Sequence, residues 1–333
     1  MASVCVLGAG SWGSAMAILI ARNGHWTRLW GRSESHMAEL ARDRCNKRYL
    51  PDIRLPENLE CSSDLQQSVR HRDIVLIAIP SHAFRSTLEQ IESHLDRTTR
   101  IAWATKGLDP ESGGLLHETV HQMFSEQPSI AVVSGPTFAT EVARNLPTAM
   151  TIASPDSRFA SELSEILHNE RFRVYTSDDI IGVQLGGAVK NVLAIATGAA
   201  DGLGFGANSR AAIVTRGLAE LIRLGLALGA KKETLMGLAG LGDIVLTCTD
   251  NQSRNRRLGI GLGQGRPLEE VLREIGQEVE GVSAAREIHR MAKKHNIEMP
   301  IAEQVFKVLY ENVSPTTAVR NLLVREQKKE QIQ

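Results

Sequence analysis

A glycine-rich turn near the start of the chain constrains its fold more than any other feature. Gly8-Ala9-Gly10-Ser11-Trp12-Gly13 follows an apolar strand predicted over Val4–Leu7 and opens a helix predicted over Trp12–Ala21. The first glycine permits a tight turn, the second lets the backbone approach a pyrophosphate, and the third lets helix and strand pack closely. The helix N-terminus then stabilises the phosphate charge. The turn therefore predicts a dinucleotide-binding domain.

The first half of the chain alternates short apolar runs with helical patterns, which predicts a mostly parallel sheet. We expect a helix over Arg158–Leu167 and further strands at Trp26–Trp30, Ile74–Ile79, Ile101–Thr105, Ile130–Ser134, Ala149–Ala153 and Phe172–Tyr175.

After Asp178-Asp179, which can cap a helix start, the pattern becomes almost entirely helical. Ile180–Ala200 is long and rich in small residues, and Ser209 is expected to cap the next helix, over 210–225. Pro300 and Pro315 stand at expected first helical positions. We therefore predict a Rossmann-type doubly wound α/β domain over residues 1–178 and an all-α domain over 179–333, whose polar tail from residue 325 frays.

Composition excludes several classes of function. Lys plus Arg and Asp plus Glu both number 38, so no global basic field points to nucleic acid. The one dense basic cluster is Arg254, Arg256 and Arg257; a small anion can account for it, with Arg256 and Arg257 as surface charges. The 4 cysteines and 10 histidines lack metal-ligand spacing, which predicts no metal and a reducing cytoplasm. No signal peptide precedes the first strand, and no apolar run approaches the roughly 20 residues that span a bilayer, so we expect no membrane insertion.

The end of the second predicted strand bears on the cofactor. An NAD-preferring site usually places an acidic residue there, to bind the ribose 2′-hydroxyl. Here Arg32 and Ser33 occupy that place, and a guanidinium with a hydroxyl suits a 2′-phosphate. We predict NADPH as the cofactor, with NADH as a poorer substitute; Glu34 comes slightly late but could still reach the ribose.

Lys190 stands on a helix whose neighbouring positions are small and apolar. Three and four residues away lie Gly186, Gly187, Leu193 and Ala194. Burial there would lower the pKa of the ammonium and suit it to proton transfer near neutral pH. Taken alone, the helix favours the ordinary alternative, in which the lysine extends to solvent. The rest of the chain reverses that preference.

Several motifs, in order along nearly the whole chain, resemble the soluble bacterial NAD(P)-dependent glycerol-3-phosphate dehydrogenases. They are the turn at 8–13, Ile79-Pro80-Ser81-His82-Ala83, Thr105-Lys106-Gly107, Ser134-Gly135-Pro136-Thr137-Phe138-Ala139, the stretch 187–212, Leu238-Ala239-Gly240-Leu241-Gly242-Asp243, and 247–256. That family reversibly reduces dihydroxyacetone phosphate to sn-glycerol 3-phosphate, a precursor of phospholipids. The resemblance implies the same reaction here, and a homodimer.

The resemblance also implies roles for individual residues. Lys190 would be the general acid/base at the C2 oxygen, Asp243 its acidic partner, and Lys106 a contact to both substrate and cofactor. The ordinary alternatives are a turn for Asp243 and a solvated loop for Lys106. Arg254 and Asn255, with the Ser253 hydroxyl, would bind the substrate phosphate. Further substrate contacts implied are Gly135, Thr137, Asn191 and Thr247, and cofactor contacts are Gly8, Gly10, Ser11, Trp12, Gly13, Arg32, Ala139, Arg254, Val279 and Glu280, the last of which could merely cap a helix.

Two other functions fit parts of the pattern. A 2-hydroxyacid or ketopantoate-type reductase would keep the architecture but bind a carboxylate, and the cluster 253–255 argues for phosphate. A dinucleotide sensor without turnover would keep the glycine turn but would have no need of Lys190, Asp243 and Lys106 together.

Overall fold

The computed structural model describes residues 1–324, so the predicted frayed tail Arg325–Gln333 lies outside the described residues. The chain divides into two compact units. The first comprises Met1–Thr105 with Leu116–Ile180, and the second comprises Lys106–Leu115 with the residues from Ile181 onward. The division near residue 180 lies close to the expected one at 178. No local pattern indicates, however, that Lys106–Leu115 belongs with the helical unit.

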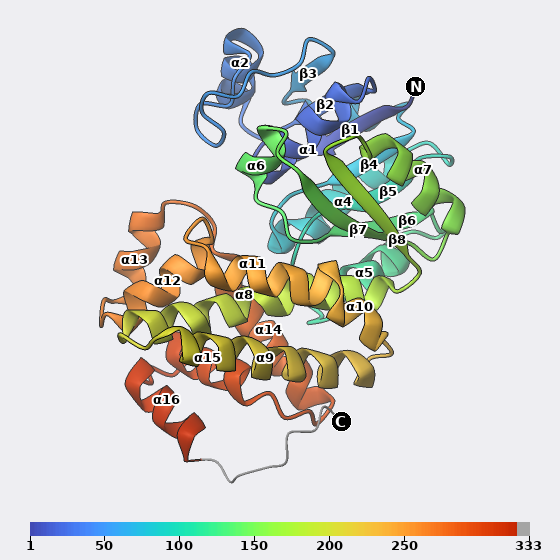
Figure 1. Ribbon diagram of the computed structural model, residues 1–333. Coiled ribbons are helices and arrows are strands. Elements are labelled where there is room, and N and C mark those ends of the chain that lie inside the picture. The colour runs from blue at the N-terminus through green and yellow to red at the C-terminus, as the bar shows by residue number, and fades with distance from the viewer. Residues whose placement is uncertain (325–333) are drawn as a thin grey trace. The chain divides into compact units, whose positions relative to one another are not determined.

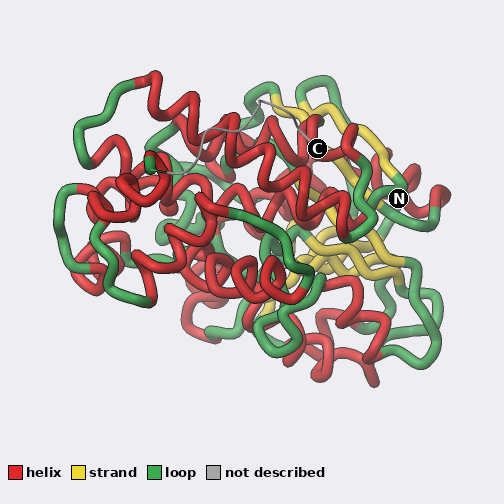
Figure 2. The backbone as a smooth tube through the Cα atoms, turned by 90° about the horizontal axis from the view of Figure 1, so that it is seen from below, coloured by secondary structure: helices red, strands yellow, loops and turns green. Residues whose placement is uncertain are grey.

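The first unit is built on an eight-stranded sheet with strand order β3-β2-β1-β4-β5-β6-β7-β8, drawn in yellow in Figure 2. All neighbouring strands are parallel except the antiparallel pair β6 and β7. This confirms the doubly wound α/β prediction. The strands are β1 (Ser3–Leu7), β2 (Trp26–Trp30), β3 (Leu59–Ser62), β4 (Ile74–Ile77), β5 (Arg100–Trp103), β6 (Ile130–Ser134), β7 (Thr148–Ala153) and β8 (Phe172–Ser177).

Strand β4 is apolar at all four positions and fully buried, as expected for a central strand covered on both faces. Helix α1 (Ser11–Arg22) is buried at every position from Gly13 to Ala21 because it packs against β1, β2 and α6. The short edge strand β3 and several helices of this unit were not predicted individually. The other helices of this unit are α2 (Glu34–Asp43), α3 (Leu65–Val69), α4 (Phe84–Ile91), α5 (Leu116–Met123), α6 (Ala139–Ala143), α7 (Ser157–Leu167) and the 3₁₀ turns η1 (Ser81–Ala83) and η2 (Glu92–His94).

Every regular element among the described residues of the second unit is a helix (Figure 1). Leu108 and Leu115 belong to its apolar core, which explains why the segment between them folds with this unit. Its elements are α8 (Ile180–Gly202), α9 (Ala207–Ala227), α10 (Lys232–Met236), the π-helical turn η3 (Leu238–Gly242), α11 (Asp243–Thr249), α12 (Arg254–Gly263), α13 (Leu268–Ile275), α14 (Glu280–Lys294), α15 (Pro300–Tyr310) and α16 (Pro315–Leu323).

Two of the three helix starts predicted in this unit from a proline or a serine agree with the structure. Pro300 and Pro315 do open α15 and α16. The expectation that Ser209 caps a helix beginning at residue 210 was wrong: α9 begins three residues earlier, at Ala207 after the N-cap Gly206, and Ser209 lies inside its first turn. A glycine N-cap carries no side-chain signal, so the nearest serine was mistaken for the cap.

Helix α8 is the core helix of the second unit. By length and composition it could cross a membrane, contrary to the expectation that no such run exists. In the folded protein, 89% of its most apolar 18-residue window is buried, which identifies it as a core helix. Its apolar character comes from packing on all sides, not from lipid.

Candidate active site

The glycine turn of the first unit has the backbone geometry that a dinucleotide site needs. Gly8 has a φ of +117°, and a Cβ there would lie 2.5 Å from the carbonyl oxygen of Ala78. A Cβ on Gly13 would overlap the carbonyl oxygen of Gly8. Both positions therefore require glycine, one for its dihedral angle and both for the close approach of backbone.

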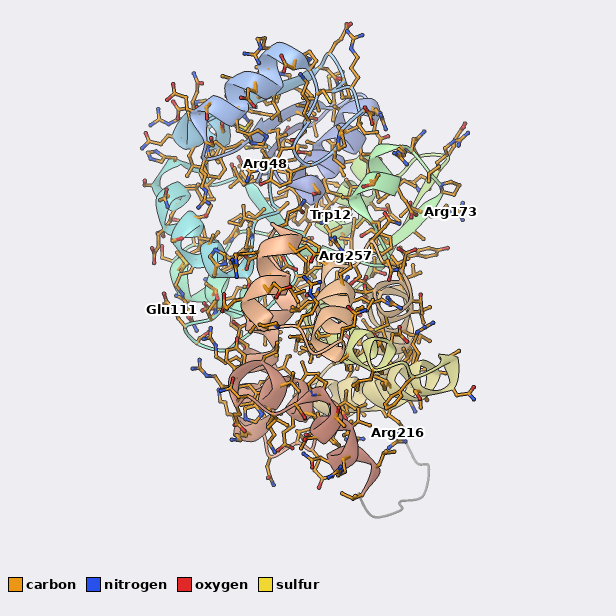
Figure 3. The ribbon with its side chains drawn as sticks, turned by 90° about the vertical axis from the view of Figure 1, so that its left-hand side faces the viewer. Trp12, Arg48, Glu111, Arg173, Arg216 and Arg257 are labelled. Atoms are coloured by element: carbon orange, nitrogen blue, oxygen red, sulfur yellow. The ribbon has the colours of Figure 1, made fainter. Side chains whose placement is uncertain are left out.

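The N-terminus of α1 is open to an anion. Gly10 is its N-cap, and no side chain in the described chain caps it. A Cβ on Gly10 would meet nothing within 4 Å. Ser11 and Trp12 begin the helix (Figure 3). The backbone N–H groups at a helix N-terminus and the helix dipole suit a pyrophosphate, so the residues present fit a dinucleotide.

Asn46 supports this turn, and the sequence reading missed it. It is completely buried, and its Nδ2 donates to the carbonyl oxygen of Ala9 (3.1 Å) and to the Ser14 hydroxyl (2.8 Å). It comes 33 residues after the last glycine of the turn, in a stretch without a motif, so only the tertiary structure reveals it.

Arg32 is exposed just after β2, where a 2′-phosphate would be bound. Ser33 serves as the N-cap of α2, its hydroxyl accepting from the His36 backbone N–H at 3.3 Å. The hollow beside Ser33 is also lined by His36 and by Arg48, which is labelled in Figure 3. Lys47, Glu39 and Asp43 line the same hollow, so its basic and acidic side chains balance, and Arg32 remains the exposed cation at the end of β2.

The loop after β6 carries three more predicted residues. Gly135 has a φ of +154°, and a Cβ there would lie 2.9 Å from the Cα of Met150. The Thr137 hydroxyl donates to the Gly135 carbonyl oxygen at 3.2 Å, which holds the loop in shape. Ala139 is the first residue of α6. All three lie at the carboxyl end of a sheet strand, where ligands bind in open α/β folds.

In the second unit, Lys190 and Asp243 form a buried ion pair. Lys190, on α8, is 7% exposed, and Asp243, the first residue of α11, is completely buried. The Nζ of Lys190 lies 2.6 Å from Oδ1 of Asp243 and 3.0 Å from the Thr247 hydroxyl. The Nζ of Lys106 lies 2.7 Å from the other carboxylate oxygen, Oδ2. The four residues predicted to lie around the reacting oxygen are thus brought together.

Burial and neighbouring charge set the protonation of this group. Loss of water lowers the pKa of Lys190 to about 8, against the opposing influence of the Asp243 carboxylate. The ammonium of Lys106 lowers that pKa further. A lysine titrating near neutral pH can both donate and accept a proton at useful rates.

The backbone before Asp243 is shaped to bring the carboxylate against α8. The π-helical turn η3 leads into α11, and π turns recur at functional sites. A Cβ on Gly186 would overlap the Ala239 carbonyl oxygen, and one on Gly240 would overlap that of Leu235. Gly186 therefore lets η3 pack backbone to backbone against α8, one turn before Lys190, and Gly240 lets η3 pack against α10.

Two amides form a chain beside Lys190. Asn255 donates from Nδ2 to Oδ1 of Asn191 at 2.9 Å, and its own Oδ1 accepts from the Gly281 backbone N–H at 2.9 Å. Asn191 donates to Oε2 of Glu280 at 3.4 Å. Each amide is fixed in one orientation, with at least one N–H left for a ligand.

Arg254 lies close enough to Glu280, at the end of this row of amides, to influence its ionisation. Glu280 is half-buried, and loss of water raises its pKa, whereas Arg254, then Lys190 and Lys106, lower it. Three cations therefore surround one carboxylate in the second unit. Ser253 caps α12 by accepting from the Arg256 backbone N–H at 3.1 Å, and Val279 is the N-cap residue of α14. Glu280 is the first residue of α14, and its side chain engages Asn191 instead of capping the helix.

Arg256 corrects one expectation. It was predicted to be a surface charge, but it is 6% exposed and paired with Asp201. Its guanidinium is committed to protein partners and cannot contribute to an anion site. Arg257 is exposed, as expected, and is labelled in Figure 3. Across residues 1–324, no group of three or more His, Cys, Asp or Glu side chains is arranged to hold a metal ion.

Comparison with known proteins gives a consistent result for both units. Residues 3–160 match the family model of the NAD-dependent glycerol-3-phosphate dehydrogenase N-terminus, and residues 179–320 match that of its C-terminus. The glycerol-3-phosphate dehydrogenase [NAD(P)+] of Colwellia psychrerythraea is 55% identical over 328 residues, which is 98% of each chain.

Solved structures agree. The glycerol-3-phosphate dehydrogenase of Coxiella burnetii superposes with a TM-score of 0.94 at 50% identity, covering 97% of this chain and 99% of that one. A ketopantoate reductase from Ralstonia eutropha gives a TM-score of 0.61 at 16% identity, over 96% of this chain and all of the other. The second likeness shows a shared fold alone.

Proposed function

The chain belongs to the NAD(P)-dependent glycerol-3-phosphate dehydrogenases, and from that membership we propose how its own residues carry out the reaction. It is an oxidoreductase that reduces dihydroxyacetone phosphate to glycerol 3-phosphate with NADPH or NADH. The observation that carries the residue assignment is the buried contact of Lys190 with Asp243, at 2.6 Å. The ketopantoate reductase alternative is less supported, because that likeness is one of fold.

Lys190 acts as the general acid during reduction. The nicotinamide, when bound, supplies the hydride that adds to C2 of the ketone. The carbonyl oxygen then takes a proton from the Lys190 ammonium, so that a C–H and an O–H bond form as the C=O π bond breaks. In the reverse direction, neutral Lys190 removes the hydroxyl proton.

Asp243 and Lys106 prepare Lys190 for this task. Asp243 accepts from both lysines and from the Thr247 hydroxyl, which fixes the direction of the Lys190 ammonium. Lys106 adds positive charge beside the position where the substrate oxygen becomes negative, and the Thr247 hydroxyl, which accepts from Lys190 and donates to Asp243, holds the ammonium beside that position. Such preorganised charges lower the barrier because they need no rearrangement during the reaction.

The phosphate of the substrate binds at the start of α12. Arg254 supplies a charged fork, Asn255 and Asn191 supply amide N–H groups, and Ser253 keeps its O–H free to donate while its oxygen accepts at the cap. Binding energy from the phosphate, remote from C2, can be used to align the ketone for hydride transfer.

The cofactor lies on the glycine turn, with contacts from Gly8 to Gly13, and on Arg32 at the 2′-phosphate. NADPH is preferred because Arg32 stands where an NAD site has an acidic residue. We assign Gly135 and Thr137 to the substrate side and Ala139, Val279, Glu280 and Arg254 to further cofactor contacts. The protein acts as a cytoplasmic homodimer that supplies glycerol 3-phosphate for phospholipid synthesis, and free thiols at all four cysteines suit that compartment.

The test is to follow NADPH absorbance with the purified protein and dihydroxyacetone phosphate, then with NADH, and then with ketopantoate. We expect consumption with dihydroxyacetone phosphate and little with ketopantoate. Consumption with ketopantoate alone would overturn the phosphate site. Binding of NADPH without consumption of any substrate would instead indicate a sensor. A Lys190→Met variant, shown to be folded by its NADPH binding, is the inactive control, since its side chain has a similar length but cannot donate a proton.

A further inference from the structure

Arg256 makes a buried three-way junction that the reaction itself does not use. Its Nε donates to the Cys248 carbonyl oxygen at 3.1 Å, its Nη1 to Oδ1 of Asn251, and its Nη2 to Oδ2 of Asp201. The three partners come from α11, from the linker between α11 and α12, and from the end of α8. A planar guanidinium with separate N–H groups is suited to hold three elements at fixed angles.

Asp201 is held in place from a second side. Arg210, on α9, donates to both of its carboxylate oxygens, at 3.1 Å and 2.9 Å. One carboxylate therefore joins two arginines, and its side chain is only 12% exposed. Removing one partner of such a buried pair would leave the others with uncompensated charge, so the junction has little freedom to rearrange.

Helices α8 and α12 also pack with their backbones in direct contact. A Cβ on Gly198 would overlap the Arg256 carbonyl oxygen, and a Cβ on Gly259 would overlap that of Ile195. The seam continues from the contact of Asn191 with Asn255. The junction and the seam together fix where α12 begins relative to α8.

The linker held by Arg256 separates two groups with different proposed tasks. On one side, α11 carries Asp243 and Thr247. The residue after Thr247 is Cys248, whose carbonyl oxygen accepts the hydrogen bond from Arg256. On the other side, α12 opens with Arg254, two residues before Arg256. The linker geometry therefore sets the distance between the acid/base group and the guanidinium assigned to the phosphate.

We propose that Arg256, held by Asp201, is a positioning residue that sets the separation between Lys190 and Arg254 to the length of a phosphorylated three-carbon substrate. This inference rests on the proposed function, which assigns the phosphate to Arg254. Arg256 itself touches no substrate. Its effect should appear only when a substrate engages both ends of the site at once, because a substrate without phosphate does not report where Arg254 lies.

The experiment compares Arg256→Gln with Arg257→Gln on two substrates, dihydroxyacetone phosphate and unphosphorylated dihydroxyacetone. Arg257 is the matched control, since it is the exposed neighbour on the same helix. For Arg256→Gln we expect kcat/KM with dihydroxyacetone phosphate to fall by about tenfold or more, and a much smaller loss with dihydroxyacetone. The control should match the unchanged protein with both. NADPH affinity and thermal unfolding, measured alongside, report on the cofactor site and on the fold.

Equal losses with both substrates would overturn the proposal, because they would show a general structural role; so would no loss at all. If dihydroxyacetone reacts too slowly to measure, a double-mutant cycle of Arg254→Ala and Arg256→Gln, measured as kcat/KM with dihydroxyacetone phosphate, replaces the comparison. In the Arg254→Ala background, Arg256→Gln should lower kcat/KM little further. Fully additive losses would contradict the inference. If Arg256→Gln does not fold, Asp201→Asn replaces it with the same expectation. A failure of the proposed function is distinct, because the unchanged protein would then not consume NADPH.

Discussion

Lys190 and Asp243 are 53 residues apart in sequence and lie on different helices, yet the Nζ of Lys190 is 2.6 Å from Oδ1 of Asp243 in the second unit, where both side chains are buried. A buried carboxylate beside a buried ammonium is costly to place and costly to break. Asp243 accepts from Lys106 as well, so two cations share one anion. With both lysines charged, the group of three carries a net positive charge, which suits the proposed position of the substrate oxygen.

Replacing Lys190 with Met should abolish most turnover. The aliphatic chain fills the same space, but no group remains to protonate the C2 oxygen, and losing a general acid costs about a hundredfold or more in kcat. Steady-state kinetics with dihydroxyacetone phosphate measure this, with NADPH affinity as the control for folding. A kcat within a few-fold of the unchanged protein would remove Lys190 from the mechanism.

The pH dependence of reduction should follow Lys190. Because its pKa is lowered to about 8, kcat for ketone reduction should fall as pH rises through that value, when the ammonium is lost. Asp243 raises this pKa, so Asp243→Asn should move the decline to lower pH as well as slow the reaction. A pH–rate profile of both proteins tests the assignment. An unmoved decline in Asp243→Asn would show that another group titrates.

Arg32→Ala should shift the cofactor preference toward NADH. The exposed guanidinium can pair with a 2′-phosphate but gains little from a 2′-hydroxyl, so its loss should raise KM for NADPH by about tenfold and leave KM for NADH nearly unchanged. Parallel titrations with the two cofactors give the ratio. Should both constants move together, Arg32 does not read the 2′ position.

The regular features of this chain could be predicted because they are local. The glycine turn at 8–13 and the buried runs of β1 and β4 are visible in a few consecutive residues. The meeting of Lys190 with Asp243 was expected only through resemblance to a family, since no local pattern joins two helices.

What was missed depends on tertiary partners. An arginine beside two others is expected on the surface, yet Arg256 is buried because Asp201 lies opposite it, 55 residues away in sequence. Likewise, Lys106 was expected within the sheet domain, but Leu108 and Leu115 pack into the helical core and take the segment with them. Burial of charge is decided by a partner that the sequence does not mark.

Glu287 offers a separate test of buried charge, outside the proposed site. It is completely buried on α14, and no donor among the described residues meets its carboxyl oxygens in good hydrogen-bond geometry, although the Leu108 backbone N–H is near enough to lower its pKa. Burial raises its pKa to about 7, well above its ordinary value of 4.5, although Arg286 and Arg290 oppose the shift. The folded state therefore holds a proton that the unfolded chain releases, so this group costs stability as pH rises from about 4.5 through about 7.

Glu287→Gln removes that cost without changing the shape of the side chain. We expect its thermal unfolding temperature to exceed that of the unchanged protein above about pH 7, by a few degrees, and the difference to shrink toward about pH 5, where both side chains are neutral. Calorimetry across this range measures the effect. Glu278→Gln, an exposed acid near the start of the same helix, is the control and should show no such trend. A neutral amide and a neutral carboxyl differ little in their cost of burial, so the expected difference in unfolding temperature comes from ionisation of Glu287 and must vary with pH. A difference in unfolding temperature that does not vary with pH would therefore mean that Glu287 is not the group that titrates.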